Sequence, residues 1–154
     1  MNETLSGLGA TEDHARLLYD SFLRWTGKAL IQASPNASLK DQLFQSSTVI
    51  LSHGTEPDPV LNYGNQAALS LWEMPWETFT GTPSRLTAEP MERQERARFF
   101  ENVTRDGYVD NYTGIRISLS GRRFYIMQAT VWNLIDEQNQ YRGQAATFSD
   151  FRYC

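Results

Sequence analysis

The sequence of 154 residues has little of what most cofactor and metal sites need, since it contains one cysteine, Cys154 at its end, and two histidines, His14 and His53. One cysteine cannot form a disulfide within the chain, and a structural zinc site would need other ligands. A haem needs an axial ligand. His14 lies in the first turn of a predicted surface helix and His53 where a strand meets a loop, so we do not expect a haem.

Positive charge and long apolar runs are also scarce. Fourteen Lys and Arg against 18 Asp and Glu give a net charge of −4, which argues against broad binding to nucleic acids or anionic membranes. No stretch approaches the roughly 18 apolar residues of a membrane span, and residues 1–13 lack the basic and apolar regions of a leader peptide. These absences predict a cytoplasmic globular protein. Its length suffices for one domain with a core of its own.

An amphipathic helix is predicted near the N-terminus, because Thr11 can cap it and two acidic residues follow. Three apolar side chains recur on one face at spacings of four and three: Leu18, Phe22 and Trp25. Gly27 allows a kink or a break, and Pro35 stops the helix. The stripe must be covered, either by the sheet of the same chain or by a second subunit in a homodimer. Both alternatives are open.

The rest of the chain alternates short strands and helices before ending in long strands. The side chain of Asn65 can cap a helix over 66–72. Pro90 suits the start of a longer helix that ends before Gly107. Strands are predicted at 49–51, 60–63, 108–119, 122–135 and 141–151. The order predicts an α+β fold, with a five-stranded antiparallel sheet and short helices on one face. We divide the chain into an N-terminal helical extension, 1–43, and a domain at 44–154.

Several stretches resemble the MEKHLA domain family, a group related to PAS domains. The resemblance rests on DPVLNYGN at 58–65, PSRLTAEPM at 83–91 and VWN at 131–133. It is supported by AAL at 67–69, LWE at 71–73, GRRF at 121–124 and GQAA at 143–146, and it covers about 44–148.

The resemblance implies a PAS-like cup that senses a small organic molecule or a partner protein. Members are stand-alone proteins of bacteria and algae, which is the type expected here, or C-terminal domains of plant homeodomain-leucine-zipper transcription factors. The hexapeptide that names the plant domain and any DNA-binding or zipper segment are absent from this sequence. A light-sensing flavin–cysteine adduct would need a thiol inside the fold, and a terminal Cys154 does not supply one.

Candidate ligand contacts come from the expected cup. Arg85 could clamp a carboxylate or phosphate, or it could pair with Glu89 or Glu73 and pin its loop. Strict alternation along 122–135 places Gln128 on one face with aromatic residues, where a buried amide would need a partner. The large aromatics could line a pocket or simply fill the core. The candidate ligand-binding residues are His53, Tyr63, Trp72, Arg85, Phe124, Gln128, Trp132 and Gln144.

Three functions remain open from the sequence. The first is a non-catalytic sensory or regulatory module that binds a small ligand or a partner. The second is a small enzyme with a cone-shaped, isomerase-like fold and a hydrophobic substrate, for which His53, Asp58 and Asp110 are the only candidate bases near the cup. The third is a protein–protein interaction module without a cavity. No residue pattern identifies a catalytic nucleophile or an acid–base pair.

Overall fold

The structure is a computed structural model that describes residues 5–88 and 90–154, without the side chains of 90–93, 96 and 100. The helical elements are η1 (Leu8–Ala10), α1 (Glu12–Thr26), α2 (Leu39–Gln45), α3 (Gln66–Trp72), α4 (Trp76–Phe79), η2 (Ser84–Thr87) and α5 (Pro90–Asp106). The strands are β1 (Val49–His53), β2 (Leu61–Gly64), β3 (Tyr108–Ile117), β4 (Arg123–Ile135), β5 (Tyr141–Phe148) and β6 (Asp150–Tyr153).

The strands of the described chain form one antiparallel sheet in the order β2-β1-β5-β4-β3, and β6 pairs with the first half of β4. The last predicted strand, 141–151, is therefore two strands separated at Ser149, both of which pair with β4. The sheet thus has six strands rather than five. The antiparallel sheet with short helices and a preceding amphipathic helix confirms the predicted fold class.

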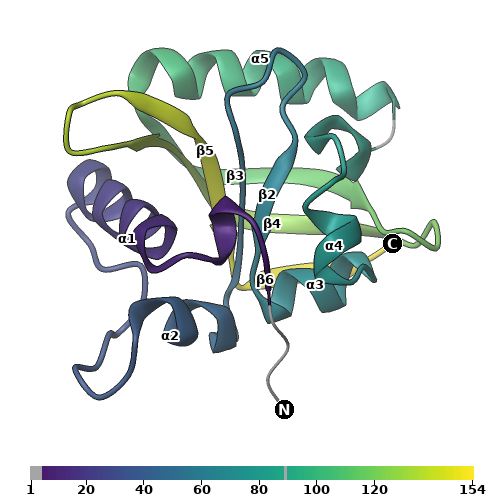
Figure 1. Cartoon of the computed structure of the whole chain (residues 1–154). Coiled ribbons are helices and arrows are strands. Elements are labelled where there is room, and N and C mark those ends of the chain that lie inside the picture. The colour runs from purple at the N-terminus through teal and green to yellow at the C-terminus, as the bar shows by residue number, and fades with distance from the viewer. Residues whose placement is uncertain (1–4, 89) are drawn as a thin grey trace.

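Helices cover both faces of this sheet. The first core cluster joins α1 and α2 to the face that carries Ile50, Trp132 and Leu134. The second cluster joins α3 to the opposite face, which carries Phe124 and Phe148. Figure 1 shows α1 and α2 together on one side of the sheet, α3 and α4 near its other end, and α5 running above it. The second face forms the predicted cup.

Helix α1 begins where the sequence predicts and ends earlier than Pro35. The side chain of Thr11 accepts a hydrogen bond from the backbone N–H of His14, and Gly27 ends the helix in the left-handed conformation with φ of 73°. The predicted stripe packs against the chain's own sheet, since Leu18 and Phe22 are buried. The ring of Phe22 lies edge-on to that of Trp132, with 4.9 Å between centroids.

The strict alternation predicted for 122–135 is wrong, because β4 contains a bulge at Gln128. Gln128 has φ of 53°, and the pairing register with β3 shifts between Ala129 and Ile126. One extra residue reverses the faces of every later side chain. Gln128 is exposed, and Trp132 points to the α1 side instead of joining Phe124 in the cup.

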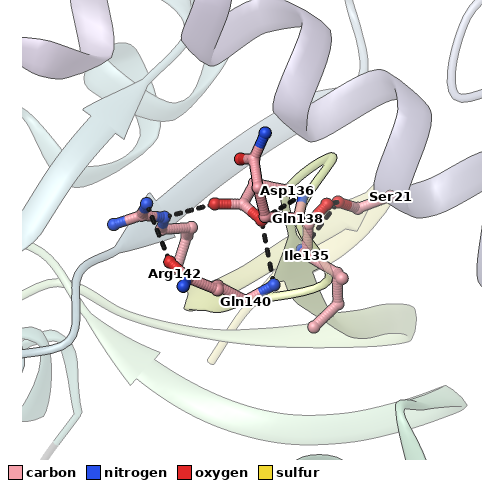
Figure 2. Close-up of polar contacts among 6 residues, drawn as sticks. All are labelled: Ser21, Ile135, Asp136, Gln138, Gln140 and Arg142. Carbon is pink, nitrogen blue, oxygen red and sulfur yellow. Dashed lines mark hydrogen bonds and ion pairs between the residues drawn. The ribbon is translucent and has the colours of Figure 1, made fainter.

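Helix α1 is hydrogen-bonded through Ser21 to the end of β4, next to the turn between β4 and β5, as Figure 2 shows. The hydroxyl of Ser21 donates to the carbonyl of Ile135 at 3.1 Å and accepts from its N–H at 2.9 Å. The Asp136 carboxylate then accepts from the backbone N–H groups of Gln138 and Gln140 and from Arg142 Nε, each within 2.9 Å. These bonds, led by the one from Gln140, hold the pKa of Asp136 below its usual range.

Replacing this carboxylate is expected to loosen the turn. Asp136→Asn should give a small fall in melting temperature at neutral pH, because the amide loses the ion pair with Arg142. Since the folded-state pKa is lowered, the contribution is present above the unfolded pKa and disappears as the pH falls through the folded pKa. Thermal unfolding at neutral pH measures the fall in melting temperature, and the same measurement at acidic pH shows whether the difference disappears. Glu137→Gln is an exposed control in the same turn. Equal melting temperatures of Asp136→Asn and the unchanged protein at neutral pH would contradict this prediction.

Candidate functional site

A cavity lies between the cup face of the sheet and the segments that cover it. Its apolar lining is contributed by strands on the floor and by α3 and α5 above: Leu51, Leu61, Trp72, Phe99, Ile126, Val131, Ala146 and Phe148. The space open to the centre of a water-sized sphere is about 40 Å³. Since one water needs roughly 10–15 Å³ by this measure, the cavity holds about three waters or a ligand of a few atoms.

Few polar side chains reach this cavity. They are His53, Ser84, Thr87, Tyr112, Arg116 and Gln144, with Ser52 at the margin. The Nδ1 atom of His53 lies 3.0 Å from the carbonyl oxygen of Gly54, and Thr87 Oγ1 donates to the Ser84 carbonyl at 2.8 Å. An apolar cavity with a few placed polar groups is the usual form of a small-molecule site.

Gln144 connects the cavity to the helices. Its Nε2 atom donates to Thr104 Oγ1 at 3.0 Å and to Asn133 Oδ1 at 3.1 Å. Asn133 in turn donates from Nδ2 to the Val103 carbonyl of α5 at 2.9 Å, while its own carbonyl accepts from Trp25 Nε1 of α1 at 2.9 Å. Gln144 of the cavity lining is therefore bonded directly to Thr104 of α5, and the backbone of Asn133 contacts α1.

Three of the eight predicted ligand contacts line the cavity: His53, Trp72 and Gln144. Phe124 is buried on the same face and packs on Trp72, with ring centroids 5.2 Å apart, but it lies outside the cavity lining. Tyr63 and Trp132 belong to the cluster on the α1 side. Their place there follows from the strand pleat for Tyr63 and from the bulge for Trp132.

Arg85 is not directed into the cavity. It is about half exposed, and its Nε atom forms an ion pair with Asp58 at 3.1 Å. The alternative partner Glu73 instead accepts from Ser118 Oγ at 2.7 Å and from the backbone of Ser120, and Glu89 lies outside the described residues. Asp58 lies between β1 and β2 and Arg85 lies on η2, so the ion pair between them holds the Arg85 side chain at the surface. Whether any predicted contact binds a ligand stays a prediction.

Sequence reasoning assigned His14 to a surface and did not include Arg116 among the candidate contacts, and the structure buries both. His14 is 2 % exposed, and its Nε2 atom lies 3.0 Å from Ser52 Oγ. Burial lowers the pKa of His14 from 6.5 to about 4. Arg116 is 5 % exposed and lines the cavity. The available signal in the sequence was the spacing of two residues along β3, which places Tyr112, Gly114 and Arg116 on the same face of the strand.

Within the described ranges, no helix is both long and apolar enough to cross a membrane. Nor do the described residues contain a group of three or more His, Cys, Asp or Glu side chains that could hold a metal ion. The described chain is characterised instead by a six-stranded antiparallel sheet with a cup that helices cover.

The sheet and its helices are similar to solved PAS and light-oxygen-voltage domains. A PAS domain of a protein from Colwellia psychrerythraea superimposes with a TM-score of 0.63 at 13 % identity, covering 74 % of this chain and 92 % of that one. The light-state dimer of the fungal blue-light photoreceptor Vivid gives a TM-score of 0.62 at 14 % identity, covering 99 % of both chains. At such identities the likeness shows the fold.

Sequence comparison adds a curated relative and a family. The homeobox-leucine zipper protein ATHB-9 of Arabidopsis thaliana is 27 % identical over 124 residues, or 79 % of this chain. This chain spans only 15 % of the length of that relative. The model of the MEKHLA domain matches residues 12–153, a range that includes α1 and every strand of the described sheet. With nearly its whole length matched, the chain belongs to the MEKHLA domain family.

Proposed function

We propose that this chain is a sensory or regulatory module that binds a small organic ligand in the cup without catalysing a reaction. The observation that supports it best is the cavity, which combines an apolar lining with buried polar side chains. The family and the fold support a sensory role, and we place that role in the cytoplasm. A flavin–cysteine adduct is not part of the proposal, because Cys154 is exposed and follows the last strand.

A population shift would couple the ligand to the rest of the molecule. Helix α5 reaches the cavity through Phe99, whose ring packs on Tyr112 with centroids 4.1 Å apart. Among its described side chains only Val103 is buried, so most of the described side chains of this helix lie at the surface rather than in the core. A ligand that fills the cup would favour one position of α5, and the bonds from Gln144 and Asn133 would extend the change toward α1.

A partner protein is a second possible readout. Leu23 on α1 and the aromatics Phe151 and Tyr153 on β6 are exposed, and these surfaces could hold a partner or a second copy of the chain. A homodimer through α1 stays a prediction. It would use the outward side of α1, since Leu18 and Phe22 are buried against the sheet.

The described lining favours binding over catalysis. It contains no Asp or Glu. Of the three candidate bases His53 lines the cavity, whereas Asp58 is exposed in its ion pair and Asp110 is exposed on β3. A general base must reach the proton that it removes, so these carboxylates are poorly placed for chemistry in the cup.

Native mass spectrometry of the purified protein, compared with its denatured mass, tests ligand binding. We expect an additional mass that is lost on denaturation. Ala146→Leu should remove it, because Ala146 lines the cavity and a larger side chain would occupy a space of about 40 Å³. Ala37→Leu, at an exposed position, is the matched control and should retain the ligand. A native mass equal to the denatured mass, together with no binding of the small molecules tested below by NMR, would favour the protein–protein interaction module.

A further inference from the structure

Arg116 is a buried cation in the cavity without a described acidic partner. Its side chain lines the cavity from β3, and the residue is 5 % exposed. Nη1 donates to the carbonyl of Ile115 at 2.7 Å, and Nη2 donates to the hydroxyl of Tyr112 at 3.0 Å. The guanidinium also lies over the Tyr112 ring, 5.4 Å from its centroid. No ion pair joins Arg116 to any carboxylate in the described part of the chain.

These neutral contacts leave part of the hydrogen-bonding capacity of the guanidinium unused. Arginine has five N–H donors and stays protonated in proteins, so burial does not remove its charge. Burying a charge is costly unless it is paired and hydrogen-bonded. The hydrogen bonds to Ile115 and Tyr112 account for two donors and supply no negative charge. The remaining donors border a cavity whose other lining is largely apolar.

A second donor in the same cavity also lacks an acceptor. Trp72 is 1 % exposed, lines the cavity from α3, and its indole Nε1–H has no hydrogen-bond partner among the described residues. Both residues line the same cavity, and both are adjacent to Phe124: Arg116 pairs with it across the strands, and its ring lies 5.2 Å from that of Trp72. A buried indole N–H normally finds a partner, so Trp72 offers a ligand in this cavity a second donor.

We propose that the cup binds a small monocarboxylate with a short apolar tail, and that Arg116 binds its carboxylate. This rests on the proposed function and adds the chemical class of the ligand. The carboxylate matches the forked donors of a guanidinium and supplies the missing charge. One negative charge suffices, because Arg116 is the only Arg or Lys in the described lining. The tail is short because the open space is about 40 Å³.

The test compares one matched pair of ligands and a second anion, all with the whole protein. Butyrate and butyramide have nearly the same shape and differ in charge, and inorganic phosphate serves as a second anion. Binding is followed by NMR through the indole N–H signal of Trp72, assigned with Trp72→Phe. We expect butyrate to bind at least about tenfold more tightly than butyramide, since hydrogen bonds to a charged group are stronger than those between neutral groups. The Trp72 signal should shift on binding.

Variants assign the effect to Arg116. Arg116→Gln should remove the preference for butyrate over butyramide, while Arg85→Gln, in the exposed ion pair, should retain it. If Arg116→Gln does not fold, the comparison of butyrate with butyramide on the unchanged protein still decides whether the cup prefers a carboxylate. Equal binding of butyrate and butyramide, or tighter binding of phosphate, would overturn the carboxylate proposal and leave a ligand-binding cup. No binding of any of them, with a bare native mass, would overturn both proposals.

Discussion

Trp132→Ala is expected to lower the free energy of unfolding by about 3–5 kcal/mol, the usual cost of truncating a large buried aromatic. Trp132 is completely buried between β4 and α1, with its ring edge-on to Phe22. Its indole N–H has no acceptor, so the variant breaks no hydrogen bond and the loss measures packing alone. Urea denaturation followed by circular dichroism gives the difference.

The matched control is Tyr125→Ala on the same strand. Tyr125 is 37 % exposed, and truncating it should cost much less than truncating Trp132. Limited proteolysis within α1 adds a second readout, because the helix loses the centre of its contact surface in Trp132→Ala. A loss below about 1 kcal/mol for Trp132→Ala would mean that α1 contributes little to the fold. The division of the chain at 43 and 44 would then gain support as a folding boundary, which so far stays a prediction.

Local signals in the sequence located the helices well. The cap of α1 uses Thr11 and that of α3 uses Asn65, whose side-chain oxygen accepts from the N–H of Ala68 at 3.1 Å. Both depend on residues within one turn, so the residue types are sufficient. Asn65 also accepts from the N–H of Ile50 and donates to the carbonyl of Thr48. These long-range bonds could not be read from a cap pattern.

The faces of β4 could not be predicted, because a bulge depends on the neighbouring strand. β3 contains an extra residue at Asn111, with φ of 63°, and β4 contains one at Gln128, with φ of 53°. The two irregularities lie on either side of the pair Tyr112 and Ala129. An apolar pattern with period two gives no sign of this pairing. The aromatic Trp132 was therefore placed in the cup that it does not reach.

The role of Arg116 in the cavity lining was missed for a related reason. Arg116 lies close in sequence to Arg122 and Arg123, and a cluster of arginines near a hairpin normally indicates a solvated edge. Burial of Arg116 follows from what covers β3, namely α5 with Phe99 and the turn of η2. Such cover is a tertiary property. The predicted Arg85 had the right chemistry for an anion, but its partner Asp58 lies on the same surface.

The acid sensitivity of the fold is expected to depend largely on His14. Ser52 Oγ has one hydrogen and donates it to Asn62 Oδ1, so it must accept from the Nε2–H of His14. Nδ1 of His14 then carries no proton and has no hydrogen-bond partner. Protonating it would create a buried cation and an N–H without an acceptor. This agrees with a pKa lowered by burial to about 4.

The direction of the pH effect follows from this lowered pKa. Below pH 6.5 the unfolded chain takes up a proton at His14, while the folded protein does so only near pH 4. Stability contributed by His14 is therefore complete above pH 6.5 and is lost as the pH falls toward 4. At 1.36 kcal/mol per unit the loss is about 3 kcal/mol. Urea denaturation across this range measures it, and His14→Gln, whose amide can still donate to Ser52, should show a flatter dependence. Direct NMR titration of His14 near its ordinary pKa in the folded protein would refute the argument, since a solvated His14 could not hold α1 against β1 through Ser52.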